Sequence, residues 1–484
     1  MPNKITAEFL RNSRISNRNV DARLTAIVGL GPTTLNITDE PVVRGTGSVD
    51  QLSAYPGSGI NVSQIADFPG VNSGALNYVL ISQGGVLYNQ NSASISNDGE
   101  ITWSGDPDVD VNIPAAGSVY YVSYQHDVPS SQYDPEEFSD VTDIRAKYGA
   151  ESNTTGILTT AGSINLENGA PAVLLVQASG SAYNENNYKL AINKLLKRSN
   201  IEDLVIVFPT NNSVTRAQQE TLITYAMTHI MKSNAVGRER GLIYGSPSLL
   251  SAPDGIDTIG DKSTSGTYLY KAFTTTNEDI CYIVPSRVRR KDENGNYMEL
   301  DANFAAAAVA GLQSSLLKRS TPMHEMKISG IEIENNKWED YELEKLSNGG
   351  CLVLISQDNI VSIYDATTTD KTSADTEEKS VIVGKRLVKR TLRDGLRNEF
   401  FNGKGTVILP GTETDVEAKA EGLLGGLVRD GELFSYGVID DPSTGERKIT
   451  AKVDSSEPRR INLDCSVKFL YPLKNIRITI STFV

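Results

Sequence analysis

The pattern of hydrophobic and polar residues divides the chain into regions of different character. From about Asp21 to Val128 it forms short β-rich pieces, LTAIVGL, GALNYVLIS, GEITWSG and SVYYVSYQH, separated by Gly, Asn, Asp and Pro. Short apolar runs between such turn residues are typical of strands in a small sandwich or barrel. The pattern therefore predicts an all-β domain over residues 21–130.

From about Ser131, continuous apolar runs alternate with amphipathic ones. We interpret APAVLLVQ, IEDLVIVFP, RGLIYG and ICYIVP as buried strands, and NNYKLAINKLLKR and the segment after Thr215 as helices between them. Thr215 and Gln218 have the spacing of a helix capping box. This βαβ order predicts an α/β core with a mostly parallel or mixed sheet over residues 131–365.

The polar stretch DATTTDKTSADTEEK, residues 365–379, predicts a surface loop or linker. After it we expect a basic helix near Gly384 to Phe401, and a second helix that opens with the capping-box residues Thr414 and Glu417. Several strands follow. The pattern predicts a C-terminal α+β domain over residues 366–472.

Both ends of the chain favour extended arms. The last residues alternate apolar and polar side chains, as in a strand with one buried face: Ile476, Arg477, Ile478, Thr479 and Ile480. We expect a strand arm over residues 473–484. Residues 1–20 are basic and too poor in apolar side chains for a core, so they predict an arm that orders only against another surface. Its candidate contact residues are Ile5, Phe9, Arg11, Arg14, Ile15 and Arg18.

Composition narrows the classes of function. The 484 residues exceed what one hydrophobic core covers, and the net charge of −14 argues against a general binder of nucleic acid or anionic membranes. The three cysteines share no disulfide or zinc spacing. The apolar run FAAAAVAGL is too short to cross a bilayer, and residues 1–20 do not form a secretory signal. We expect no cofactor, no direct nucleic-acid contact and no membrane insertion.

Catalytic constellations are not apparent. His126, His229 and His324 have no partner at metal-binding or catalytic spacing, and we find no P-loop or serine-hydrolase motif. A packed or solvated histidine is the simpler interpretation of each. We therefore expect no metal site and no enzymatic activity.

The basic helix carries a regular stripe of charge. Four arginines fall at i, i+4, i+7 and i+11 on one helix face: Arg386, Arg390, Arg393 and Arg397. Such a stripe is a solvated surface, a nucleic-acid face or a docking face for acidic protein. Because the rest of the chain is acidic, we favour the last and predict that the stripe contacts carboxylates of a neighbouring copy.

Extended ends suggest self-assembly. An arm that adds a strand to a neighbour's sheet makes backbone hydrogen bonds between copies. Repeated head to tail, such a contact builds a helix unless its rotation closes a ring. We therefore expect the two arms to complete their hydrogen bonding on adjacent copies of the same chain.

Two segments carry a family resemblance. They are VPSRVRRKDENGNYMELDANFAAAAVAGL, residues 284–312, and the terminal block from the basic helix through TDVEAKAEGLLGGLVRDGELFSYGVIDD to INLDCSVKFLYPLKNIRITIST. These segments resemble the tail sheath proteins of contractile-tailed bacteriophages, of the myovirus type, and the resemblance covers residues 131–484. It implies a subtilisin-like, non-catalytic α/β core, an outward-facing domain before residue 130 and arms that add strands to neighbouring subunits.

The resemblance also implies a function. It is that of a structural subunit that forms stacked hexameric rings, polymerises helically around the tail tube and contracts to drive the tube through the host envelope for genome ejection. The implied partners are further copies of the chain, the tail tube protein, and baseplate and tail terminator proteins. The implied location is the virion tail, after assembly in the host bacterial cytoplasm. The alternatives are the sheath of a non-phage contractile injector, a static shell or tube protein, and a hydrolase of subtilisin-like fold.

Overall fold

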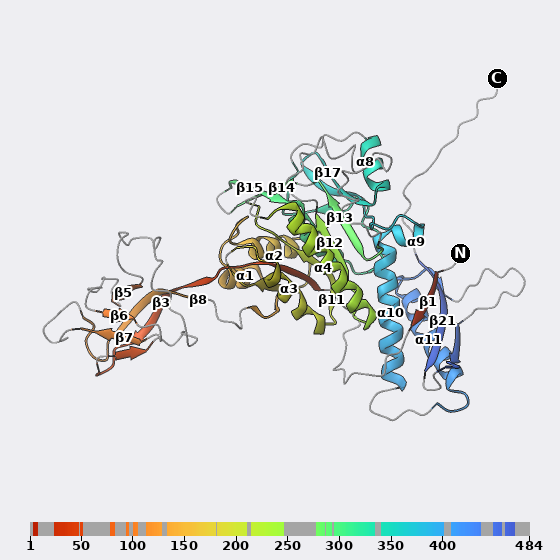
Figure 1. The fold of residues 1–484 in the computed structure, drawn as a ribbon, viewed down its shortest axis with the longest axis horizontal. Coiled ribbons are helices and arrows are strands. Elements are labelled where there is room, and N and C mark those ends of the chain that lie inside the picture. Colours follow the sequence, from red (N-terminus) through yellow and green to blue (C-terminus); the bar gives the residue numbers. More distant parts are fainter. Residues whose placement is uncertain are drawn as a thin grey trace, which may run out of the picture. The chain divides into compact units, whose positions relative to one another are not determined.

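The structure is a computed structural model, and its chain forms two compact units that we describe separately (Figure 1). The first comprises Met1–Leu30, Pro135–Ala178 and Ala182–Val484, and the second comprises Gly31–Asp134 and Ser179–Ser181. The residues that the structure describes are 3–7, 24–47, 49–51, 78–82, 93–95, 100–104, 113–127, 133–180, 182–210, 214–245, 277–285, 287–292, 295–333, 340–400, 408–436, 449–456 and 460–469.

A nine-stranded mixed sheet forms the centre of the first unit, with the strand order β16-β18-β17-β13-β12-β11-β2-β10-β9. Neighbouring strands from β10 through β2, β11, β12 and β13 to β17 run parallel, whereas β9, β18 and β16 are antiparallel to their neighbours. This confirms the predicted α/β core with a mixed sheet. The strands are β2 (Leu24–Leu30), β9 (Glu136–Phe138), β10 (Val173–Ala178), β11 (Ile201–Ile206), β12 (Gly241–Gly245), β13 (Ile280–Val284), β16 (Lys327–Ile328), β17 (Cys351–Gln357) and β18 (Ile360–Asp365).

Strand β2 corrects one predicted boundary. We expected residues 21–30 to begin the β-rich domain. In the structure every residue of β2 is buried, and the strand pairs in parallel with β10 on one side and β11 on the other. The prediction was wrong because a predominantly apolar strand belongs inside a sheet that is covered on both faces, and β2 finds that cover in the α/β sheet.

Helices cover this sheet, and its central strands are therefore buried along their whole length. Helix α4 begins with the predicted capping box, in which Thr215 and Gln218 bond each other's backbone. Helices α2 and α7 approach closely: a Cβ on Gly311 of α7 would lie 2.2 Å from the Asn165 carbonyl oxygen of α2. The helices are α1 (Val141–Tyr148), α2 (Ile157–Glu167), α3 (Glu185–Lys194), α4 (Arg216–Ala235), α7 (Ala302–Ser315) and α8 (Asp340–Asn348); a 3-10 turn, Leu195–Lys197, extends α3, and the hairpin β14 (Arg287–Lys291) and β15 (Tyr297–Asp301) precedes α7.

The C-terminal part of the first unit has its own small core. Apolar residues of α10 and α11 pack there with residues of β20 and β21. The sheet has the order β1-β21-β19, with β20 also paired to β21. These elements are α9 (Ala374–Glu377), α10 (Lys379–Phe400), α11 (Thr412–Arg429), β1 (Asn3–Ala7), β19 (Ser435–Tyr436), β20 (Ile449–Val453) and β21 (Ile461–Lys468).

The stretch 365–379 is only partly the surface linker that its composition predicts: Thr372 and Ser373 are exposed, but both ends of the stretch are buried. Thr367, Thr369 and Lys379 are all less than 5% exposed. The Thr367 hydroxyl donates to the Cys351 carbonyl oxygen over 2.9 Å, and the Thr369 amide donates to the Ile280 carbonyl oxygen over 2.8 Å. Threonine and lysine are polar enough to predict exposure, but tertiary hydrogen bonds satisfy their polar groups inside the fold.

The start of α11 also differs from the prediction. The helix begins at Thr412, with Gly411 as its N-cap residue, so Thr414 lies inside the first turn. Glu417 does not complete a capping box; its carboxylate accepts a hydrogen bond from the Ala451 amide over 2.7 Å. The sequence pattern was correct about the helix and wrong about the role of the glutamate, because β20 supplies a competing donor.

Among the described residues of the second unit are two three-stranded antiparallel sheets, β3-β8-β5 and β4-β7-β6. A buried polar cluster joins them: the Tyr120 hydroxyl donates to Asp50 over 2.8 Å, and Arg44 pairs with the same carboxylate over 3.2 Å. The all-β character agrees with the sequence pattern. The strands are β3 (Thr34–Val43), β4 (Val49–Gln51), β5 (Tyr78–Ser82), β6 (Ala93–Ile95), β7 (Glu100–Trp103) and β8 (Val119–Asp127).

Candidate functional site

Helix α10 was the sharpest candidate for a functional surface, and the structure buries both of its long faces. Val388, Leu392 and Leu396 pack into the C-terminal core, as their spacing predicts. On the other face, Arg386 and Arg390 reach β11 of the large sheet. A strongly amphipathic helix therefore lies between an apolar core and a set of carboxylates.

The carboxylate of Glu202, on β11, gathers three guanidinium groups. Arg386 Nη1 lies 3.1 Å from Oε1, while Arg390 Nη1 and Arg319 Nη1 lie 2.5 and 3.3 Å from Oε2. The Glu202 side chain is only 1% exposed. Burial by itself raises the pKa of Glu202, but the charges of Arg390, Arg386 and Arg319 lower the pKa to about 2. The residue is therefore ionised at neutral pH and holds segments from three parts of the chain together.

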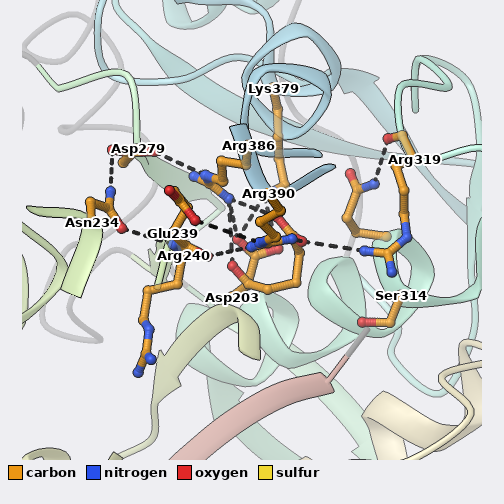
Figure 2. A network of polar contacts seen from close by, with 12 residues as sticks. Asp203, Asn234, Glu239, Arg240, Asp279, Ser314, Arg319, Lys379, Arg386 and Arg390 are labelled. Atoms are coloured by element: carbon orange, nitrogen blue, oxygen red, sulfur yellow. Dashed lines mark hydrogen bonds and ion pairs between the residues drawn. The ribbon is translucent and has the colours of Figure 1, made fainter. Parts of the chain in front are cut away.

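Asp203 and Asp279 extend this network, as Figure 2 shows. Lys379 Nζ lies 3.0 Å from Asp203 Oδ2, and Arg386 Nε lies 2.9 Å from Asp279 Oδ1. Asn234, near the end of α4, donates to the other oxygen of Asp279 over 2.7 Å. The network thus connects α10 with β11, with the residue before β13 and with the end of α4.

Further along α10, Arg390 and Arg393 contact the segment that leads into β12. Arg390 donates to the Glu239 carbonyl oxygen, and Arg393 forms an ion pair with the Glu239 carboxylate. Gly241, at the start of β12, gives room to Arg386 and Asp203, because a Cβ at that position would lie 2.4 Å from Arg386 Nη2 and 2.7 Å from Asp203 Oδ1. The fit between helix and sheet therefore leaves no space for a larger residue at Gly241.

The predicted contact of the arginine stripe with a neighbouring copy is wrong for Arg386 and Arg390. Arg386 and Arg390 are 4% and 2% exposed, and their charges are paired inside their own chain. Arg393, also largely buried, pairs with Glu239 and Asp394. Arg397 is half-buried on the same helix, and its proposed role in a contact between copies stays a prediction.

The N-terminal strand also pairs at home. Residues Asn3–Ala7 form β1, which lies antiparallel to β21 of the same chain, with Ile5 opposite Cys465. The structure therefore does not bear out the expectation that this strand is added to another copy. Five further predicted residues of the N-terminal arm and the five of the C-terminal strand lie outside the described residues: Phe9, Arg11, Arg14, Ile15, Arg18, Ile476, Arg477, Ile478, Thr479 and Ile480.

Sequence reasoning missed the acidic partners of α10, although a signal was present. Glu202 and Asp203 stand side by side in IEDLVIVFP, an otherwise apolar strand. A carboxylate in a strand buried on both faces requires a cationic partner, because an unpaired buried charge is strongly unfavourable. This signal predicts that two basic side chains lie nearby, but not which ones.

His229 is buried beside a guanidinium group. Its Nε2 lies 3.3 Å from Arg240 Nη1, and Arg240 also donates to the carbonyl oxygens of Leu195 and Arg198. Burial, together with the charges of Arg240 and Lys232, lowers the pKa of His229 to about 3. Within the described ranges, no group of His, Cys, Asp and Glu could hold a metal ion, and no helix is both long and apolar enough to cross a membrane.

Comparison with known proteins adds to this description. The tail sheath protein of Mycobacterium phage Bxz1 is 24% identical over 376 residues, which cover 75% of this chain and 58% of the relative. The chain thus spans less than two thirds of that protein. No family model matches the chain. The predicted resemblance to tail sheath proteins is confirmed.

Solved structures decide the fold. The contracted helical sheath of the anti-feeding prophage matches with a TM-score of 0.53 at 11% identity, over 74% of this chain and 90% of that one. The chain has the fold of a contractile sheath protein. The sheath of an extracellular contractile injection system, PVC, also in its contracted state, matches with a TM-score of 0.50 at 13% identity, over 72% and 87% of the two chains. At such low identities these matches show the fold alone.

Proposed function

We propose that this protein is the structural subunit of a contractile tail sheath. It polymerises helically around a tail tube and contracts to drive the tube through the host envelope for genome ejection. The observation that supports this most directly is the sheath fold shared over 74% of the chain with a contracted helical sheath. The relative named as a phage tail sheath protein supports the phage setting. Within this proposal the α/β part is a non-catalytic core of subtilisin-like type.

The proposal assigns the two terminal arms to contacts between copies. Strand β1 lies beside β21 and is joined to the unit only through residues 8–23, which fully extended reach roughly 50 Å. The same antiparallel register can form between two copies, because the backbone bonds exchanged are identical. In the sheath, β1 of one copy occupies this position on the next, and residues 473–484 add a strand in the same way. Arg397 remains the candidate for a charged contact between copies.

Partners and location follow from the same proposal. The subunits form stacked hexameric rings, and they contact the tail tube, the baseplate and the tail terminator proteins. Similarity to a chain solved in a helical sheath and to a chain solved in a baseplate supports self-assembly and contact with a baseplate. The sheath is part of the virion tail and is assembled in the cytoplasm of the host bacterium.

Electron microscopy of the purified full-length protein tests the proposal. We expect long striated tubes, and two helical lattices of different diameter when intact tails are compared before and after triggering. Globular particles that remain monodisperse at high concentration would refute self-assembly. A lattice that stays the same after triggering would favour a static shell or tube.

A second candidate function is the sheath of a non-phage contractile injector. One of the matching structures, the PVC sheath, belongs to an extracellular contractile injection system. Particles purified from the source cells distinguish the two: a DNA-filled head attached to the sheath supports the phage tail, and headless sheathed particles support the injector.

A further inference from the structure

Helix α4 presents a stripe of uncharged side chains, with the exposed Lys232 at its edge. Six exposed, uncharged positions recur at i, i+4, i+7, i+11, i+14 and i+18 and therefore form one continuous stripe along the helix. The residues of this stripe, which we call the α4 face, are Ala217, Thr221, Thr224, Thr228, Met231 and Ala235.

The threonines of the α4 face turn their polar groups inward. The hydroxyls of Thr221, Thr224 and Thr228 donate to backbone carbonyl oxygens one turn earlier, over 2.9, 2.9 and 3.1 Å. With its hydroxyl bonded to the helix, each threonine offers a methyl group to solvent. Met231, 62% exposed, adds the largest apolar side chain. The α4 face is therefore more apolar than its composition indicates.

The α4 face is held in a fixed position. Leu222, Ala226 and Ile230 on the opposite side of the helix are buried in the main core. Near the end of the helix, Asn234 donates to Asp279, which also accepts from Arg386 of α10. A surface anchored in this way loses little conformational entropy when another protein covers it.

Charge indicates what covers it. The chain has a net charge of −14, so two copies carry an overall repulsion that a contact surface must avoid. The buried centres of protein interfaces are depleted of charged residues and enriched in methionine. On the six uncharged positions two copies of an acidic chain approach with little electrostatic and desolvation penalty, and the one exposed charge at the edge of the stripe, Lys232, is opposite in sign to the net charge of a second copy.

We propose that the α4 face is a contact surface for a second copy of this chain in the assembled sheath. This inference rests on the proposed function and adds the surface through which the folded bodies of two subunits meet. The face is about 27 Å long at 1.5 Å per residue and roughly 10 Å wide. It is smaller than the about 800 Å² per partner of a stable interface, so it forms one part of a larger contact.

Thiol protection tests the contact without disturbing it. The three native cysteines are buried, so Thr228→Cys introduces an accessible thiol on the α4 face. With a maleimide reagent we expect labelling at least tenfold slower in assembled tubes than in free subunits. Ala146→Cys, at an exposed position of α1, reports general access of the reagent to the tubes. Equal labelling of position 228 in tubes and free subunits would overturn the proposal.

A charge substitution provides the second test. Thr228→Glu places a carboxylate on the α4 face and should raise the protein concentration required for tube formation at least tenfold, whereas Thr228→Ala should assemble like the wild type. Normal assembly of Thr228→Glu would overturn the contact. If the wild-type chain forms no tubes, it is the proposed function that fails. If tubes form and position 228 stays accessible, only the α4 contact fails.

Discussion

Helices α10 and α4 carry opposite signals in the sequence, and the structure reverses both. The arginine stripe of α10 favours an outward docking face, yet Arg386 and Arg390 are buried against Glu202. The sequence of α4 suggests no surface function, yet six of its exposed positions form an uncharged stripe with a single exposed lysine, Lys232, at the edge. Charge along a helix therefore does not indicate exposure. What decides it is whether the fold places opposite charges beside that face.

The difference has a simple electrostatic reason. A guanidinium group on an acidic protein is attracted to carboxylates of its own chain as much as to those of a neighbour, and the former are present at a far higher effective concentration. Glu202 and Asp203 supply such carboxylates inside the fold, where they pair with Arg386 and Lys379. The six residues of the α4 face carry no charge that must be paired, so they remain available for contacts in which charge would be unfavourable.

Removing the Glu202 carboxylate should cause the largest loss of stability among the changes considered. Glu202→Gln leaves three buried guanidinium groups without their shared anion, and breaking a buried ion pair in this way costs about 3–5 kcal/mol. We expect that loss in the free energy of unfolding of the free subunit, measured by urea titration. Glu137→Gln, at an exposed position of β9, is the matched control and should change stability by less than about 0.5 kcal/mol. Equal stability of the two variants would show that the α10 network is dispensable.

Filling the space beside Arg386 tests the same contact from the other side. A Cβ at Gly241 would lie 2.4 Å from Arg386 Nη2, so Gly241→Ala should destabilise the subunit by about 1–3 kcal/mol through overpacking. Gly422→Ala on α11 is the control, because nothing lies within 4 Å of the new methyl group there. That change should be neutral or stabilising by up to about 1 kcal/mol. The two melting temperatures check the difference, and a fully stable Gly241→Ala would contradict the tight fit.

Acid should weaken the region where α4 meets Arg240. The pKa of His229 is lowered to about 3, so between pH 6.5 and 3 the unfolded chain binds a proton that the folded chain does not. Stability present above pH 6.5 is thus lost as the pH falls, by at most about 1.4 kcal/mol per pH unit. His229→Gln should remove this component. Unfolding free energies of both proteins from pH 7 to pH 4.5 check it, and curves that remain parallel would count against a neutral, buried His229.

The smallest effect on the free subunit is expected on the α4 face. Thr228→Glu changes an exposed helical position, so its free energy of unfolding should stay within about 0.5 kcal/mol of the wild type. Urea titration of free subunits measures this. A large loss of stability would show that position 228 is structural, and the contrast between the helices would then disappear.

Much of the fold could be predicted from periodicity. The alternation of apolar strands with amphipathic helices gave the α/β core, and the spacing of Thr215 and Gln218 gave the start of α4. Boundaries failed where a neighbour competed: β2 was assigned to the wrong unit, and Glu417 bonds β20 instead of capping α11. The stretch 365–379 failed for the same reason, since its polar groups find partners that local composition does not reveal.

The sequence by itself determined most of the helices and strands of the α/β core, that the chain is acidic, and that it resembles contractile sheath proteins, because these properties follow from local patterns. Only the tertiary structure decided which charged and uncharged faces point outward. Glu202 and Arg390 are far apart in the chain, and their ion pair exists because the sheet brings β11 beneath α10. Exposure depends on such long-range neighbours. The surface available for contacts between copies could therefore be identified only from the structure, in which the arginines of α10 are paired within their own chain.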